Sequence, residues 1–169
     1  MLDFRHDILP LKNIIFRTAL RIVLNREEAE DIVQDTLMKL WERRDELEQV
    51  VNLESFALTA ARNLAIDRRG RMENLNISFD EEMHDCPDEG DGSSDSSLVR
   101  KETHSFIAGI INSLPEKQRA ILQLRDIEGK SYKEIAEVLS ITESDVKVTL
   151  FRARSEMKEK ILQKKSLFL

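Results

Sequence analysis

The stretch that decides the fold spans residues 131–154 and reads SYKEIAEVLSITESDVKVTLFRAR. Ser131 followed by Glu134, and Thr142 followed by Asp145, are capping boxes that predict the first turns of two consecutive helices. Apolar residues recur at three- and four-residue spacing, which places them on the inner faces of both helices. These inward residues are Ile135, Ala136, Leu139, Val146, Leu150 and Ala153. The pattern predicts a short helix, a tight turn and a longer second helix.

The second of these helices leaves basic and apolar side chains outside its inward stripe. They are Lys147, Val148, Phe151, Arg152 and Arg154. In a helix-turn-helix the second helix enters the major groove of DNA, and its first half meets base edges. Basic side chains further along hold phosphates. A plain helical hairpin with a solvated face is the alternative, but the small Ala136 at the helix crossing and the basic second helix favour DNA binding.

A second informative stretch spans residues 29–44 and reads AEDIVQDTLMKLWERR. Its apolar stripe, which consists of Ala29, Val33, Leu37 and Leu40, is typical of a helix packed on a core. The opposite face is unusual because it combines acids with a methionine and borders the only tryptophan of the chain, Trp41. Two interpretations are open at this point. Trp41 packs against a neighbouring helix, or the face is a binding surface.

The composition favours an all-α fold. Of 169 residues, 41% are hydrophobic, 34% are charged and only 5% are aromatic, which is a helical rather than a β-sandwich composition. Five Gly and three Pro leave few turns for a many-stranded sheet. A single cysteine excludes an internal disulfide framework and fits a reducing compartment. Neither a signal peptide nor a membrane span is recognisable, so we expect a soluble cytoplasmic protein.

Charge divides the chain into three parts. The net charge is −6, but residues 71–102 carry −7 whereas residues 103–169 carry +3. The acidic segment from about Arg71 to Ser97 is rich in Asp, Glu, Ser and Gly and lacks an apolar period, which predicts a flexible linker. His84 and Cys86 within it are two possible ligands, whereas a zinc site needs about four. We therefore expect no metal.

Periodicity predicts helices on both sides of this linker and no strand. Before it we expect helices at 7–23, 26–44 and 54–69, with a loop at 45–53. After it we expect a helix at 98–112, another that opens at Pro115, and the pair from Ser131. The sequence thus predicts two small helical domains, residues 1–71 and 98–169, joined by the acidic linker at 72–97.

Three motif blocks, taken together, resemble a known family. They are AEDIVQDTLMKLW, SFALTAARNLAIDRRGR and LPEKQRAILQLRDIEGKSYKEIAEVLSITESDVKVTLFRAR, in this order around the acidic linker. Across nearly its whole length the chain resembles the extracytoplasmic-function (ECF) group of sigma-70 family sigma factors. The resemblance implies a sigma region 2 helical bundle, a region 4 helix-turn-helix, and a non-enzymatic role without a cofactor. It implies an alternative sigma factor that directs bacterial core RNA polymerase to −10 and −35 promoter elements and stabilises melted DNA.

The resemblance also implies three sets of binding residues. The set for core polymerase, which docks on the clamp helices of the β′ subunit, is Asp31, Gln34, Asp35, Met38 and Trp41. The set for the −10 element and its melted strand is Asn52, Leu53, Ser55, Phe56, Arg62, Asn63, Arg68 and Arg69. The set for the −35 element is Arg125, Lys147, Val148, Phe151 and Arg152. The recognition helix departs from the common pattern at Ser144-Asp145 and Val148-Thr149, which bears on the −35 preference.

Further partners follow from the same resemblance. They are the β flap of the polymerase, promoter DNA and an anti-sigma factor, which in many relatives is membrane-bound and would hold the cytoplasmic chain at the inner membrane without inserting it. The acidic linker either occupies a basic channel of the polymerase or serves as a spacer. Two other classes stay open: a LuxR-type regulator that binds duplex DNA as a dimer, and a protein that only sequesters a partner. An acidic sigma factor alone should bind DNA poorly, since it neutralises few phosphates.

Overall fold

The computed structural model describes residues 1–75 and 96–167, and every regular element in these two ranges is helical. Neither range contains a strand, so the all-α fold that the composition predicted is confirmed. Nowhere in these ranges does a helix combine the length and the apolar character that crossing a bilayer requires. His84 and Cys86, the two possible metal ligands, lie outside the described residues.

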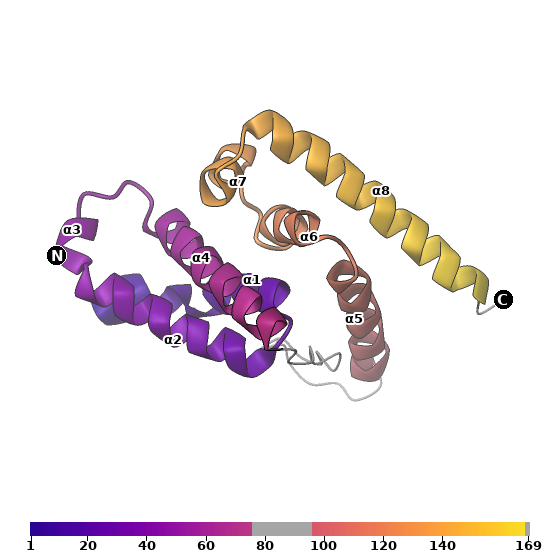
Figure 1. The fold of residues 1–169 in the computed structure, drawn as a ribbon, viewed down its shortest axis with the longest axis horizontal. Coiled ribbons are helices and arrows are strands. Elements are labelled where there is room, and N and C mark those ends of the chain that lie inside the picture. Colours follow the sequence, from indigo (N-terminus) through magenta and orange to yellow (C-terminus); the bar gives the residue numbers. More distant parts are fainter. Residues whose placement is uncertain (76–95, 168–169) are drawn as a thin grey trace.

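The N-terminal part is a bundle in which α1, α2 and α4 each contact the other two (Figure 1). In chain order its elements are η1 (Phe4–Ile8), η2 (Leu9–Leu11), α1 (Lys12–Val23), α2 (Arg26–Glu42), α3 (Arg44–Leu47) and α4 (Leu53–Asn74). The predicted stripe of α2 forms part of the bundle core: Ala29, Val33, Leu37 and Leu40 are all at most 9% exposed. Periodicity therefore assigned the inner face of α2 correctly.

The boundaries of this part differ from the sequence prediction in three places. The segment expected to begin a helix at residue 7 is a π-helical turn followed by a 3₁₀ turn, and α-helix begins only after Pro10, which has no N–H to donate. The expected loop at 45–53 contains the short helix α3. Helix α4 continues to Asn74, into the predicted linker, because its buried face extends as far as Met72, which is 4% exposed.

The C-terminal part contains the predicted helix-turn-helix. Its elements are α5 (Ser96–Asn112), α6 (Glu116–Leu122), η3 (Gln123–Ile127), α7 (Tyr132–Leu139) and α8 (Glu143–Leu167). Ser131 caps α7 as predicted: its Oγ accepts from the Glu134 N–H at 3.1 Å, and its own N–H donates to Glu134 Oε2 at 2.8 Å. Thr142 Oγ1 accepts from the Asp145 N–H at 3.1 Å at the start of α8. Both helix starts thus follow from local sequence.

Helices α7 and α8 meet on the residues that the pattern placed inward. Ile135, Val146 and Ala153 are 0% exposed and Leu150 is 2% exposed. The turn between the helices passes through Ser140 with a left-handed φ of 54°, and the Ile141 N–H donates to the Ala136 carbonyl at 3.0 Å. The buried stripe leaves the opposite side of α8 free of core contacts.

The two parts also pack on each other. In Figure 1, α6 and α7 lie between the N-terminal bundle and α8, with α4 facing α7 and α1 facing α6. Ile14 of α1 and Leu58 of α4 belong to the apolar cluster of the C-terminal part, and Leu58 is 0% exposed. The N-terminal bundle thus contributes two apolar side chains to the hydrophobic core of the C-terminal part.

Candidate binding surfaces

The outward face of α2 is open to solvent, although its inward face forms the bundle core. Met38 is 59% exposed and Trp41 is 40% exposed. The side chains of Asp31 and Asp35 are 59% and 44% exposed, and Gln34 is exposed between them. The structure therefore brings the five residues expected to bind polymerase onto one surface, in which apolar side chains adjoin acids.

Trp41 is held by two neighbours and yet remains accessible. Its ring meets the ring of Phe4 edge to face, with 5.7 Å between centroids and an angle of 82° between planes. The guanidinium carbon of Arg44 lies 4.4 Å from the Trp41 ring centroid, which is a cation–π contact. A hollow of about 650 Å³ opens here, lined by Phe4, Gln34, Leu37, Met38 and Trp41. Trp41 thus packs against a neighbour and also contributes to an exposed surface.

Arg68 links helix α4 to the acids of α2. Its Nη1 donates to Glu28 Oε2 at 2.7 Å and lies 3.8 Å from Asp31 Oδ2, while its Nη2 donates to Asp35 Oδ2 at 3.1 Å. The hydrogen bond to Glu28, with the negative charges of all three carboxylates, raises the pKa of Arg68. A residue expected to contact DNA and two expected to contact polymerase therefore form a single ion network.

The residues of the predicted −10 loop have structural contacts in this conformation. Asn52 caps α4, since its Oδ1 accepts from the Ser55 N–H at 2.9 Å, and its Nδ2 donates to Glu134 of the C-terminal part at 3.3 Å. Ser55 is buried at 8% exposure. Leu53 and Phe56 are half-buried against the bundle core. Leu53, Ser55 and Phe56 therefore belong to the first turn of α4 and not to a loop, and the N-cap residue Asn52 faces α7.

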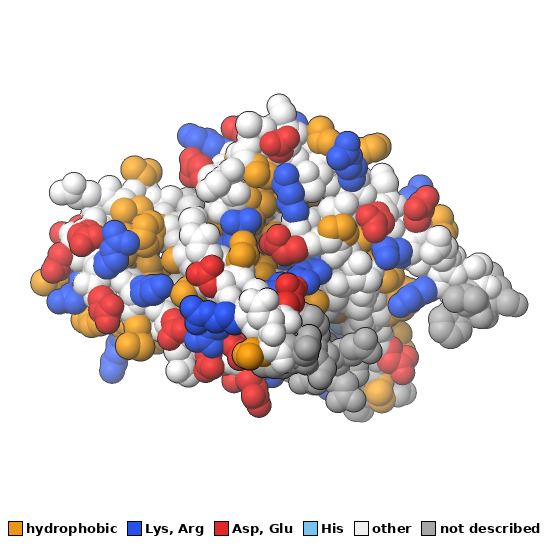
Figure 2. All heavy atoms as spheres, in the orientation of Figure 1, with side chains coloured by type: hydrophobic (Ala, Val, Ile, Leu, Met, Phe, Trp, Pro, Cys, Tyr) orange, Lys and Arg blue, Asp and Glu red, His pale blue; other side chains and the backbone are white. Residues whose placement is uncertain are grey.

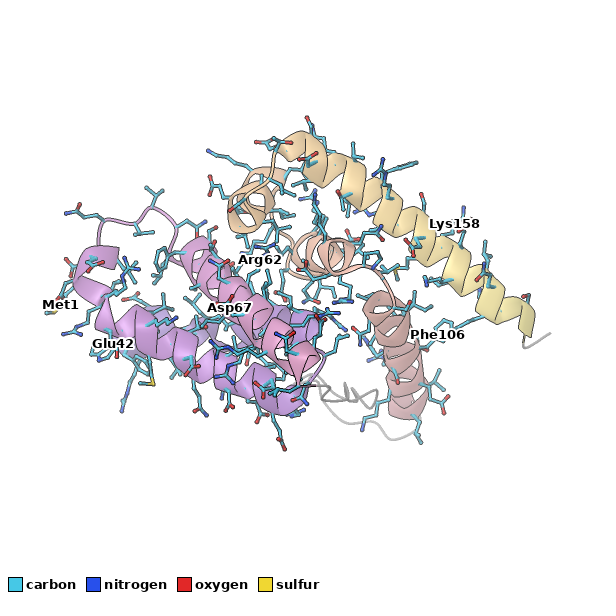
Figure 3. All side chains as sticks on the ribbon, in the orientation of Figure 1. Met1, Glu42, Arg62, Asp67, Phe106 and Lys158 are labelled. Carbon is cyan, nitrogen blue, oxygen red and sulfur yellow. The ribbon has the colours of Figure 1, made fainter. Side chains whose placement is uncertain are left out.

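The three remaining −10 candidates on α4 lie on different sides of the helix. Asn63 is exposed, whereas Arg62 is half-buried, and Figure 3 places Arg62 on the side of α4 toward α6 and α7. Arg69 donates from Nη1 to the Ile22 carbonyl at 3.1 Å and pairs with Glu73 at 2.9 Å. The structure therefore does not gather these side chains into one DNA-binding patch in the described conformation.

Four of the five −35 candidates lie on the outward side of α8. Lys147 and Arg152 are exposed, and Val148 and Phe151 are 49% and 72% exposed. An aromatic ring at 72% exposure has no packing role within the domain, so it is available to a partner. The arrangement presents two cations and two apolar groups on the first half of the second helix, the part that reads base edges in helix-turn-helix proteins.

The fifth −35 candidate, Arg125, lies against Tyr132, a residue that the sequence analysis did not single out. Arg125 is half-buried, donates to the Lys130 carbonyl at 2.7 Å, and has its guanidinium carbon 4.8 Å from the Tyr132 ring centroid. The ammonium of Lys147 lies 5.6 Å from the same ring. Tyr132 therefore holds two cations on one side of the domain. The available signal was an aromatic residue directly after the Ser131 cap.

Arginines fill the junction between the two parts, and sequence analysis had not singled out three of them. Arg17 forms a bidentate pair with Glu128, at 2.6 Å and 2.9 Å. Arg21 donates to Gln123 at 3.0 Å. Arg119 is 4% exposed and donates to the carbonyls of Arg21 and Leu114, each at 2.8 Å. Burial, together with the nearby positive charges of Arg69 and Arg21, lowers the pKa of Arg119 to about 10.

The visible surface does not carry a broad basic patch. Figure 2 shows Lys and Arg side chains interspersed with Asp and Glu over the whole face. Since DNA affinity without base contacts depends on neutralised phosphates, a mixed surface of this kind gives weak electrostatic binding. The geometry therefore offers a narrow exposed face of cations and apolar side chains on α8 and a separate acidic–apolar face on α2.

Comparisons with known proteins identify both helical parts of the chain. Residues 8–73 match the family model for sigma-70 region 2, and residues 107–157 match the model for sigma-70 region 4. The ECF RNA polymerase sigma factor SigL of Mycobacterium tuberculosis is 31% identical over 146 residues, which cover 83% of this chain and 78% of SigL. The RNA polymerase sigma-H factor of Pseudomonas aeruginosa is 29% identical over 172 residues, covering 96% of this chain and 84% of that protein.

A solved structure shows the same fold. The sigma factor RpoE of Bartonella quintana, determined in complex with the anti-sigma factor NepR, superposes with a TM-score of 0.74 at 26% identity. The match covers 93% of this chain and 95% of that chain. Two region models in the expected order, a relative above 30% identity and a matching fold all agree. The chain belongs to the ECF family of RNA polymerase sigma factors.

Proposed function

We propose that this alternative sigma factor binds core RNA polymerase through α2 and promoter DNA through α4 and α8, without chemistry of its own. The observation that carries the proposal is the outward face of α2, where Met38 and Trp41 stay exposed beside two acids. Within residues 1–75 and 96–167, no group of three or more His, Cys, Asp or Glu side chains is arranged to hold a metal ion. Binding, rather than catalysis, is the activity that these surfaces support.

The α2 face suits a basic helical partner with apolar side chains. Aromatic and methionine side chains are enriched at protein interfaces, and a few of them dominate affinity. Asp31 and Asp35 supply negative charge on the same face. We assign this surface to the clamp helices of the β′ subunit and assign the region 4 part, residues 98–169, to the β flap.

The DNA contacts divide between two elements. We assign the −35 element to Lys147, Val148, Phe151 and Arg152 on α8, where apolar side chains can meet a thymine methyl and cations can meet guanine or phosphate. We assign the −10 element and its melted strand to the loop at 48–56 and to α4, including Arg62 and Asn63. Bases held out of the stack need pockets and backbone contacts of this kind.

Binding of the −10 strand requires the two parts to separate in this proposal. Asn52 contacts Glu134, and Glu54 pairs with Lys130, so the C-terminal part covers one end of α4. Domains at 1–71 and 98–169, joined by residues 72–97, would allow that movement. We further propose that an anti-sigma factor binds the chain, as NepR binds the Bartonella RpoE, and that the chain acts in the cytoplasm, where a membrane-bound anti-sigma factor would hold it at the inner membrane.

A reconstituted transcription assay tests the proposal. Core RNA polymerase is incubated with genomic promoter fragments in the presence and absence of this protein. We expect new start sites only when both are present, and we expect Asp35→Ala and Trp41→Ala to abolish them. Glu159→Ala, an exposed acid on the far half of α8, is the matched control and should leave them unchanged. Unaltered transcription together with tight DNA binding by the protein alone would instead indicate a LuxR-type regulator.

A further inference from the structure

The N-terminal turn adds an aromatic residue to the outward face of α2. Phe4 precedes residue 8, where the match to sigma-70 region 2 begins. The turn η1 packs on α2, and the Met1 amino group pairs with Glu48 at 3.1 Å, so the start of the chain lies against the C-terminal end of α2. The Phe4 ring forms one wall of the 650 Å³ hollow and contacts Trp41. The hollow is therefore built from α2 and from a segment outside the matched region.

Local hydrogen bonds fix the turn that carries Phe4. Asp3 Oδ1 accepts from the His6 N–H at 2.8 Å, and the Asp3 N–H donates to Asp7 Oδ2 at 2.7 Å. These contacts to His6 lower the pKa of Asp3. Ile8 anchors the end of the turn in the bundle core at 0% exposure. Phe4 is thus half-buried at a defined position and is not part of a loose terminus.

The contact between Phe4 and Trp41 pre-organises the hollow for a partner. Edge-to-face packing on one side and the Arg44 cation on the ring restrict the orientation of Trp41. A binding residue that is already held in place loses less conformational freedom on association. Leu37, at 9% exposure, forms an apolar base, so the hollow suits an apolar side chain.

We propose that Phe4 extends the polymerase-binding face of α2, and that the hollow between Phe4 and Trp41 receives one bulky apolar side chain of core polymerase from a segment with basic side chains. The inference rests on the proposed function of α2. It is favoured by two features: the hollow is continuous with the exposed Met38 and Trp41, and Asp31 and Asp35 give this face the charge that complements a basic segment. Phe4 thereby becomes part of the polymerase-binding surface.

The test compares full-length variants by competition with labelled wild-type protein for core polymerase in the absence of DNA. Phe4→Ala should weaken binding about 5- to 10-fold, as expected for truncation of an aromatic side chain that lines an interface hollow. Leu9→Ala is the matched control, because Leu9 is an apolar residue of the same segment at 41% exposure and does not line the hollow; it should change affinity less than about 2-fold.

Fluorescence of Trp41, the only tryptophan, separates the possible outcomes. Phe4→Ala should increase acrylamide quenching of Trp41 in the free protein. If quenching rises while polymerase affinity stays at the wild-type value and Trp41→Ala still weakens binding, the inference about Phe4 is wrong and the proposed function of α2 survives. If Trp41→Ala also has no effect, the proposed function itself is wrong. Should Phe4→Ala fail to fold, Phe4→Leu removes the edge-to-face contact with Trp41 and should still increase quenching and weaken polymerase binding; increased quenching with wild-type affinity would overturn the inference about Phe4.

Discussion

The ion pair between Arg17 and Glu128 should stabilise the packed arrangement of the N-terminal and C-terminal parts. It joins α1 to the segment after η3 by two hydrogen bonds of 2.6 Å and 2.9 Å. Glu128 Oε1 also accepts a hydrogen bond from Gln123 Nε2 at 2.8 Å, so a second residue of the C-terminal part helps to position the carboxylate. Arg17→Ala would leave the Glu128 carboxylate facing the junction without its main positive partner. We expect this variant to favour a separated arrangement of the two parts.

The size of the effect follows from burial. The side chain of Glu128 is 6% exposed and that of Arg17 is 34% exposed. Removing one partner of a fully buried ion pair costs roughly 3–5 kcal/mol. Because a third of Arg17 is exposed, water screens the pair, and a value of about 2–3 kcal/mol is appropriate. That corresponds to a shift of about 30- to 150-fold in the equilibrium between the closed and separated arrangements.

Energy transfer between dyes on the two parts measures this equilibrium. Dyes at Glu42→Cys and Lys158→Cys, in a Cys86→Ser background, lie on the N-terminal bundle and on α8 (Figure 3). Transfer efficiency should change in Arg17→Ala, and the double reversal of Arg17→Glu with Glu128→Arg should restore most of the wild-type value. Arg26→Ala, which removes a pair between two half-exposed side chains within α2, should have no effect. Identical efficiencies in wild type and Arg17→Ala would refute the assigned role of the pair.

Four further predictions concern the two halves separately. Ile135→Ala should destabilise the chain by about 2–5 kcal/mol in urea unfolding, because the side chain is fully buried. Phe151→Ala should change stability by less than about 0.5 kcal/mol but weaken binding of the polymerase complex to −35 duplex DNA several-fold. The hydrogen bonds from Ser131 lower the pKa of Glu134 below its ordinary 4.5. The ionised carboxylate therefore stabilises the folded chain fully above pH 4.5, and this contribution is lost as the pH falls through the lowered pKa. The free energies of unfolding of wild type and Glu134→Gln should accordingly differ near pH 7 and converge in acid. Arg68→Ala should strengthen polymerase binding in the absence of DNA, measured by the same competition assay, because Asp35 then has no Arg68 guanidinium competing for its carboxylate.

The parts of the fold that sequence predicted are those set by neighbours in the chain. The Ser131–Glu134 box and the buried stripe of α2 depend on residues three or four positions apart, and the structure contains both. The exposure of Met38 and Phe151 followed from the same periodicity, because residues excluded from the stripe must face elsewhere. Local chemistry was therefore sufficient to identify the two exposed faces to which we assign binding.

The parts that sequence could not predict depend on contacts between distant segments. Arg119 is buried because carbonyls of α1 and of the turn before α6 accept from it, and no periodicity reveals a carbonyl almost a hundred residues away. Phe4 lies outside any helical stripe, since the π-helical turn around it has no 3.6-residue period. The half-burial of Arg125 likewise depends on Tyr132 and a backbone carbonyl. Periodicity predicts which face of a helix is buried, but it does not predict which distant segment packs against that face.

The ion network of Arg68 connects the two binding functions that we propose for the N-terminal bundle. In the free chain Arg68 is shared among Glu28, Asp31 and Asp35, and the last two lie on the proposed polymerase-binding face. A basic side chain of the polymerase that pairs with Asp35 competes with Arg68 for that carboxylate. The Arg68 guanidinium then has less negative charge beside it. Because Arg68 lies on α4, the helix that also carries the proposed −10 contacts, its attraction to a DNA phosphate becomes stronger. Because coupling between two binding events is reciprocal, DNA at α4 would in turn strengthen the hold of polymerase on α2.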